Sequence, residues 1–148
     1  MLRKLWQPGF VEHRGEFFAF PPLCQSPAPP APVPIWVGGH SASALRRPAR
    51  LGDGFIGSGH APDGAVRVLG RLAELRRECG RGQAPFETLL GLSTPPDLDT
   101  FRRLEERGMS SGVSYPLRYA LGPRSTVDAK RRAMEAFAER ILVPMRRG

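Results

Sequence analysis

The residues that could do chemistry in this chain gather in two short glycine-rich stretches. One is the segment 38–41 (GGHS), which follows an apolar run, and the other is the segment 57–60 (GSGH). Glycines let a backbone turn sharply or approach a ligand closely, and serine is a favoured N-cap for a following helix. A strand, a Gly-Gly turn and a capped helix start direct free N–H groups and the helix dipole at one place, which suits an anion such as phosphate. The same order is also typical of a plain strand-to-helix turn, so both interpretations stay open.

The individual side chains in these stretches have different expected roles. Ser41 either bonds a phosphate through its hydroxyl or only caps the helix. His40, beside a glycine pair, is expected to be an exposed turn residue rather than an acid or base. His60 lies where a loop should follow a strand, so it either lines a pocket or is a bystander. Asp53, before Gly54, is expected to hold loop N–H groups or an arginine such as Arg50.

No catalytic constellation independent of a cofactor is present in the sequence. There is no Ser-His-Asp order, paired-carboxylate spacing, Cys-His cluster or Walker-type loop. An enzyme built on this chain would therefore take its reactivity from a cofactor.

The elements that position these residues alternate in type. Strand-like segments are expected at 35–38, 54–57, 86–92 and 111–115, and helix-like segments at 42–50, 63–79, 97–107 and 126–142. Four such units predict an α/β fold with a parallel sheet and right-handed crossovers. Asp97 or Asp99 can cap the third helix and Gly108 can end it, whereas Pro48 should kink or shorten the first.

The amino-terminal third differs from the rest in composition. Residues 1–6 indicate the end of a helix, and residues 11–20 a hairpin around a glycine. The segment 21–34 holds seven prolines, which predicts an extended strap without regular structure. Phenylalanines in the hairpin either pack on a rim or line a pocket mouth, and Phe18 is the substrate-pocket candidate.

Several segments, in this order, resemble luciferase-like flavin monooxygenases, especially the deazaflavin-dependent branch. They are Leu5-Trp6, 11–18 (VEHRGEFF), 34–39 (PIWVGG), 44–47 (ALRR), 49–55 (ARLGDGF) and 80–81. The resemblance implies a (β/α)8 barrel that holds FMN or the deazaflavin coenzyme F-420 at the carboxyl ends of its strands. It also implies that a serine at the place of Ser41 contacts the cofactor phosphate. The cofactor-binding candidates are then Gly38, Gly39, His40 and Ser41, and the substrate-pocket candidates are His60 and Phe18.

The chain has 148 residues, whereas a (β/α)8 barrel takes roughly 250. The resemblance therefore covers a carboxyl-terminal half: a partial TIM barrel with a helix end, hairpin and strap at 1–33 and four βα units at 34–148. A truncated gene, a misplaced start and a true half-barrel all fit. Four strands cut from a barrel leave two open edges, which predicts a homodimer or a complementing amino-terminal half. Two hypotheses for the function remain: the chain is part of an oxidoreductase that acts on a small molecule, or it is a non-catalytic half-barrel without cofactor.

Composition narrows the class and the partners. The net charge is +8, but the basic residues are nearly all arginine and are spread along the chain, which indicates a solvated surface rather than nucleic-acid binding. Two cysteines, Cys24 and Cys79, lack disulfide or metal spacing and favour a reducing cytoplasm. No apolar run approaches the roughly 20 residues that span a bilayer, so no membrane association is expected.

Overall fold

The structure, a computed structural model, describes residues 1–95, 97–113 and 115–146. The chain divides into two compact units, Met1–Pro34 and Ile35–Gly148, which are described separately. In the described residues no helix combines the length and the apolar character needed to cross a membrane.

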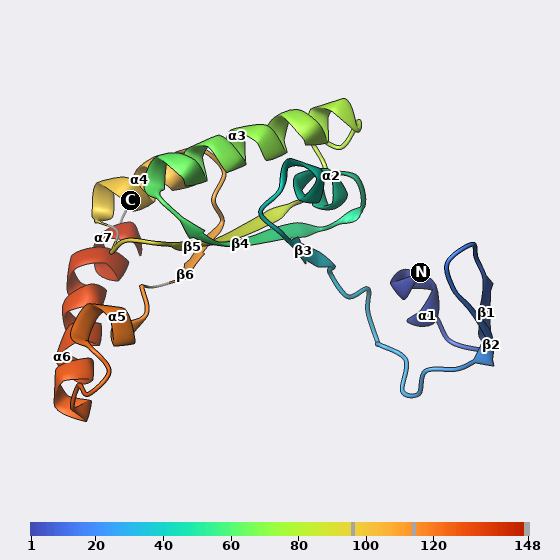
Figure 1. The fold of residues 1–148 in the computed structure, drawn as a ribbon, viewed down its shortest axis with the longest axis horizontal. Coiled ribbons are helices and arrows are strands. Elements are labelled where there is room, and N and C mark those ends of the chain that lie inside the picture. The colour runs from blue at the N-terminus through green and yellow to red at the C-terminus, as the bar shows by residue number, and fades with distance from the viewer. Residues whose placement is uncertain (96, 114, 147–148) are drawn as a thin grey trace. The chain divides into compact units, whose positions relative to one another are not determined.

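The first unit contains a short helix and a hairpin (Figure 1). Helix α1 spans Leu2–Leu5, and strand β1 (Val11–Arg14) pairs antiparallel with β2 (Ala19–Leu23). The Gly15 N–H donates to the Phe18 carbonyl at 3.0 Å and closes the turn, which confirms the predicted hairpin.

The expected lack of regular structure from Pro21 onward is wrong at its start. Pro21 and Pro22 lie inside β2, which continues to Leu23. A strand in a two-stranded ribbon has one side without a neighbouring strand, and proline is tolerated where the missing N–H faces that side. From Cys24 to Ile35 no helix or strand is present, as the prolines predicted.

The second unit is built on one parallel sheet, which confirms the α/β prediction. Its strands follow the order β3-β4-β5-β6, and every neighbouring pair is parallel. They are β3 (Trp36–Gly38), β4 (Gly54–His60), β5 (Glu87–Leu92) and β6 (Ser111–Val113). The last strand was predicted to reach Tyr115, and Ser114 lies outside the described residues.

The helices follow the strands in the expected alternation. They are α2 (Ala42–Leu51), α3 (Pro62–Glu78), α4 (Leu98–Glu106), α5 (Leu117–Leu121), α6 (Val127–Phe137), the π-helical segment η1 (Ala138–Leu142) and α7 (Val143–Arg146). Asp97 caps α4 by accepting the Thr100 N–H at 2.7 Å, and Gly108 follows the helix at φ +97°, so both terminal predictions are confirmed. Pro48 does not shorten α2. It is buried with Leu45 and Ala49, and that packing offsets the one main-chain bond that proline removes.

The core lies between the sheet and one helical layer. Figure 1 shows α2, α3 and α4 on one side of the sheet. Side chains alternate along the strands, so Phe55 and Leu90 are fully buried on the helical side while Ile56 is 45% exposed on the other. The helices contribute buried leucines to the same cluster: Leu45, Leu69, Leu72, Leu75 and Leu104. Each such side chain stabilises the fold by roughly 1.5–3 kcal/mol.

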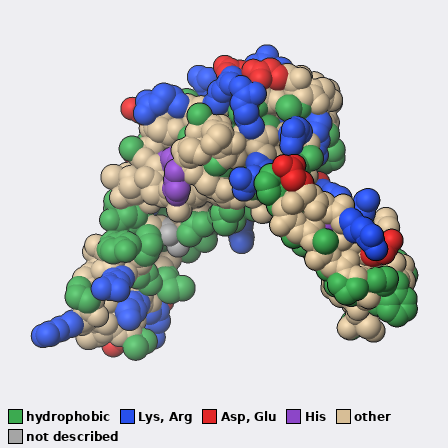
Figure 2. All heavy atoms as spheres, turned by 45° about the vertical axis from the view of Figure 1, so that its right-hand side comes forward, with side chains coloured by type: hydrophobic (Ala, Val, Ile, Leu, Met, Phe, Trp, Pro, Cys, Tyr) green, Lys and Arg blue, Asp and Glu red, His purple; other side chains and the backbone are tan. Residues whose placement is uncertain are grey.

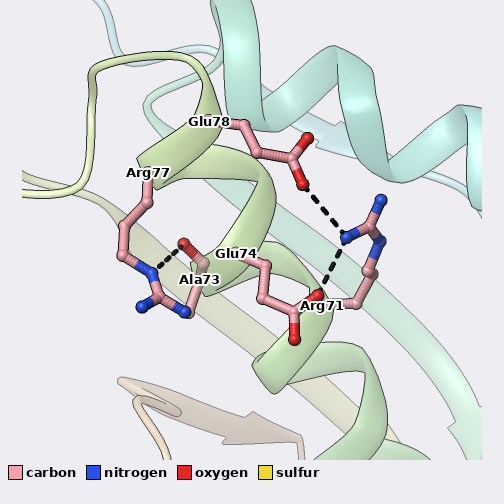
Figure 3. A network of polar contacts seen from close by, with 5 residues as sticks. All are labelled: Arg71, Ala73, Glu74, Arg77 and Glu78. Atoms are coloured by element: carbon pink, nitrogen blue, oxygen red, sulfur yellow. Dashed lines mark hydrogen bonds and ion pairs between the residues drawn. The ribbon is translucent and has the colours of Figure 1, made fainter.

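An ion-pair network on α3 lies on the solvent side of that layer (Figure 3). The Arg71 guanidinium contacts Glu74 at 2.8 Å and Glu78 at 3.3 Å, and Arg77 donates to the Ala73 carbonyl. Arg71, Glu74 and Glu78 are each between 41% and 53% exposed, so water and salt screen their ion pairs. The buried leucine stripe, rather than this network, holds α3 to the sheet.

Hydrogen bonds from Thr88 of β5 to the residues just before β6 fix the start of β6 on β5. The Thr88 N–H donates to the Ser110 hydroxyl at 2.7 Å, and the Thr88 hydroxyl donates to the Gly108 carbonyl at 2.7 Å. Thr88 is only 4% exposed, so these groups have little access to water.

We expect Thr88→Val to loosen this end of the sheet. The substitution keeps the shape but leaves the Gly108 carbonyl without its donor, at a cost of about 1–3 kcal/mol. Hydrogen exchange should rise in β6 more than in β4, and the melting temperature should fall. An unchanged melting temperature and unchanged protection of β6 would contradict this role.

Candidate functional site

The β3–α2 turn has the geometry of a tight strand-to-helix connection. Gly39 has a φ of +146°, and a Cβ built on it would lie 2.5 Å from the Ala44 Cβ. Ser41 is the N-cap of α2, and its hydroxyl accepts the Ala44 N–H at 3.1 Å. The Ser41 hydroxyl also lies 2.9 Å from that of Ser43. The first turn of a helix has N–H groups without intrahelical acceptors, and Ser41 takes only that of Ala44.

Asp53 fixes the amino-terminal ends of β3, β4 and β5, at the edge of the sheet opposite the β3–α2 turn. Its carboxylate accepts the Ile35 N–H at 2.7 Å, and its own N–H donates to the Ile35 carbonyl at 2.8 Å. Its carbonyl accepts the Glu87 N–H at 3.0 Å. Asp53 thus ties the starts of β3, β4 and β5 together, which confirms the predicted structural role of its carboxylate.

A bulge at the end of β4 determines where His60 points. Gly57 pairs with Leu90, but the next recorded pair joins His60 to Leu92, so β4 has one extra residue there. Gly59 in the bulge has a φ of +72°. The shift places the His60 imidazole beside Gly57 and 5.7 Å, ring centre to ring centre, from His40.

The structure therefore brings together His40 and His60, two candidate site residues that are 20 positions apart in the sequence. His40 follows β3 and His60 ends β4, so the imidazoles meet at the carboxyl edge of the sheet, next to the glycine turn. Figure 2 shows histidine side chains side by side on the surface of the second unit. Within the described part of the chain, the buried Nε2 of His60 has no hydrogen-bond partner. A bound ligand could supply one.

Burial, and after it the proximity of His40, lowers the pKa of His60 below its ordinary value. The neutral imidazole is therefore favoured in the fold at neutral pH. The unfolded chain takes up a proton at His60 near the ordinary pKa of about 6.5, whereas the folded chain resists it. The stability that depends on neutral His60 is intact above that pH and is lost as the pH falls through it.

We expect His60→Gln to weaken the pH dependence of stability. The wild-type melting temperature should fall between about pH 7.5 and about pH 5.5, and the fall should be smaller in the variant because the titrating group is removed. His40→Gln should give an intermediate slope, because it removes only the second cause of the shift. Parallel curves for all three proteins would contradict this account of the histidine pair.

A cavity of about 510 Å³ opens at the carboxyl ends of β4, β5 and β6. Its wall is mainly apolar and aromatic, and includes Ile56, Gly91, Val113, Tyr115 and Tyr119. The carboxyl ends of the strands are where parallel barrels form their active sites.

The sequence prediction missed the two tyrosines. Tyr119 lies on α5, a five-residue helix with no periodic signal, and Tyr115 directly precedes that helix. The Gly57-Ser58-Gly59 stretch lines the cavity, but His60 faces His40 instead. Phe18 lies on the first unit, 56% exposed, with its ring 4.8 Å from that of His13.

In the described residues no group of three or more potential ligands could hold a metal ion. A four-stranded parallel sheet with helices following its strands, and a glycine turn and apolar cavity at their carboxyl ends, form an α/β architecture consistent with part of a (β/α)8 barrel. The chain matches the family described as luciferase-like monooxygenase over residues 1–109. It belongs to that family.

Similar proteins agree with this assignment. An uncharacterised protein of Mycobacterium bovis is 36% identical over 96% of this chain and 49% of its own length. The pyrimidine monooxygenase RutA of Allorhizobium ampelinum is 30% identical over 71% of the chain and 30% of its own length. The F-420-dependent glucose-6-phosphate dehydrogenase of Nakamurella multipartita is 27% identical over 91% of the chain and 40% of its own length. The chain thus spans at most about half the length of these relatives.

The fold is also found among solved structures. An F-420-dependent secondary alcohol dehydrogenase, in complex with an F-420–acetone adduct, superimposes with a TM-score of 0.59. The match covers 75% of this chain and 52% of that one at 14% identity, so it supports the fold alone. The predicted partial barrel is therefore confirmed as an architecture.

Proposed function

We propose that this chain is the cofactor-phosphate half of a luciferase-like oxidoreductase that uses FMN or the deazaflavin coenzyme F-420. The observation that supports it best is the β3–α2 turn, where a glycine at φ +146°, a serine N-cap and an open helix start meet. Relatives named as monooxygenase and as F-420-dependent dehydrogenase support either cofactor.

The residues present fit an anionic group at this turn. The helix start offers N–H donors, Ser41 offers a hydroxyl, and the His40–His60 pair offers further N–H groups within reach of the same edge. The unpartnered Nε2 of His60 is a polar atom that a ligand could satisfy. When bound, a flavin or deazaflavin would supply the hydride or oxygen chemistry, for which the chain itself has no constellation.

In this proposal the chain's own residues bind and shield rather than react. Gly39 allows the backbone to turn tightly, and Ser41 orients the first turn of α2. The cavity wall around Val113 and Tyr119 excludes water from a small, partly apolar substrate. The free cysteines, Cys24 and Cys79, are consistent with the reducing cytoplasm we propose for it.

Ser41→Ala, compared with Thr126→Ala, tests the site. Both residues are N-caps whose hydroxyl accepts a helix N–H, Ala44 for Ser41 and Ala129 for Thr126. Each substitution should therefore lower stability by a similar 0.5–2 kcal/mol or so. Only Ser41→Ala should also weaken the binding of FMN or F-420. Quenching of the cofactor's fluorescence on titration with the protein measures this binding.

Equal cofactor affinity in both variants would exclude Ser41 from the site. A complete lack of saturable binding by the wild-type chain would favour the second candidate, a half-barrel without cofactor. The observation that keeps this candidate open is the exposure of apolar residues, such as Ile56 and Val113, on the face of the sheet opposite α2, α3 and α4. Such a face suits an association surface as well as a pocket wall.

A further inference from the structure

In the described residues one face of the parallel sheet is not covered by α2, α3 or α4, and the short helix α5 borders it through Tyr119, which lines the cavity with Ile56 and Val113. The residues on this face are those that alternate with the buried ones, and they include Ile56 and Val113, each 45% exposed, and the half-buried Trp36 and Leu89. Figure 1 shows α2, α3 and α4 together on the opposite side. Apolar surface of this kind on a soluble protein usually marks an interface.

The two edge strands, β3 and β6, point open backbone groups away from the sheet. The Ile35 carbonyl accepts from Asp53 at 2.8 Å, so the backbone groups of Ile35 face β4 and those of Trp36 and Gly38 face outward. Both backbone groups of Thr88 bond Ser110, so Thr88 and Leu90 face β6. Ser111 and Val113, which pair opposite Leu89 and Gly91, then face β5, and Gly112 faces outward on β6. Within the described residues neither edge has a further strand beside it.

These edges are complementary under a two-fold axis. All four strands run in one direction, so a rotation of 180° about an axis along the strands keeps them parallel. That rotation places β3 of one copy beside β6 of the other at both seams. Four strands from each copy give eight, the number that closes a (β/α)8 barrel.

We propose that two copies of this chain pair through β3 and β6 to close one eight-stranded barrel. Each copy has a net charge of +8, but the basic residues lie outside the sheet face that would line the barrel.

By the strand register, that face is made of ten residues: Trp36, Gly38, Gly54, Ile56, Ser58, Glu87, Leu89, Gly91, Ser111 and Val113. Glu87 is the one charged residue among these ten, and no lysine or arginine is included.

The dimer would also complete the site. Within one chain, β4 and β5 separate the β3 turn from β6, whose carboxyl end borders the apolar cavity. In the closed barrel the neighbour of β6 is the second copy's β3, so the second copy's Ser41 turn lies beside that cavity. This last step rests on the proposed function, whereas the pairing of the edges does not.

Sedimentation velocity of the whole chain without cofactor, over a wide concentration range, tests the pairing. We expect a species of twice the 16.3 kDa chain mass that stops growing at two copies, because an isologous pair leaves no free edge. Ile56→Lys and Val113→Lys should each raise the dissociation constant at least tenfold with unchanged circular dichroism. Val127→Lys on α6, 80% exposed and away from the sheet, is the matched control and should dimerise as the wild type does.

Three results would overturn the proposal. They are a monomer at every concentration, growth past two copies without a plateau, and a dimer that both lysine substitutions leave unchanged. A chain that pairs only with a separate amino-terminal half of a relative would also overturn it. A dimer that binds neither FMN nor F-420 would leave the pairing intact and count against the proposed function alone.

Discussion

Replacing Gly39 with valine should abolish cofactor binding and lower stability more than any other change in the turn. The φ of +146° is strained for a side chain, at about 1–3 kcal/mol. The new Cβ would also meet the Ala44 Cβ at 2.5 Å, and overpacking of this kind costs a further 1–3 kcal/mol or so. Relief of the clash must move the start of α2, which displaces the N–H groups that face the proposed phosphate. Thermal melts and FMN titration measure the two effects.

Gly80→Val is the matched control for this prediction. Gly80 also has a positive φ, +69°, but a Cβ there would have nothing within 4 Å. We expect a loss of stability of about 1–2 kcal/mol from the backbone alone, with FMN affinity unchanged. Equal FMN affinity in Gly39→Val and in the control would show that the turn does not form the site.

The second large effect is expected from Gly54→Val, at the start of β4. A Cβ on Gly54 would lie 2.9 Å from the Glu87 carbonyl oxygen and 2.9 Å from the Trp36 ring. The valine must therefore push the indole off the sheet and widen the contact between β4 and β5. Overpacking of this size costs about 1–3 kcal/mol, and relief by moving β5 would disturb the core.

Tryptophan emission reports this displacement directly. In a Trp6→Phe background Trp36 is the one remaining tryptophan, since the chain has two. We expect its emission to shift to the red in Gly54→Val, together with a lower melting temperature. Gly70→Ala in α3, where a Cβ meets nothing within 4 Å, should instead stabilise by about 0.4–1 kcal/mol. Unshifted emission in Gly54→Val would mean that the indole does not lie over Gly54.

The parts of the fold that depend on local chemistry could be predicted from the sequence. Ser41 and Asp97 cap helices because a short polar side chain before a helix can accept a free N–H of its first turn. Gly108 ends α4 because a positive φ is open to glycine. The alternation of strand and helix follows from hydrophobic period, which is why the sheet order β3-β4-β5-β6 agrees with four consecutive βα units.

The parts that depend on contacts between distant segments could not be predicted. The bulge that turns His60 toward His40 arises where β4 and β5 pair; the glycines of β4 indicate an irregular strand but not the direction in which the His60 ring turns. Tyr115 and Tyr119 reach the cavity through a helix of five residues, too short for a periodic signal. Pro48 was expected to kink or shorten α2, but the helix continues past it to Leu51, with Pro48 buried beside Ala49.

The most direct test of the central claim, a phosphate site at the β3–α2 turn, compares FMN with riboflavin. The two ligands share the ring system and differ in the phosphate. Charge-assisted hydrogen bonds contribute about 1.5–3 kcal/mol each, so FMN should bind at least about tenfold more tightly. The ratio should persist at about 0.15 M salt, which screens attraction by the overall charge, and should fall toward one in Gly39→Val. Equal affinities for FMN and riboflavin in the wild-type chain would contradict the claim.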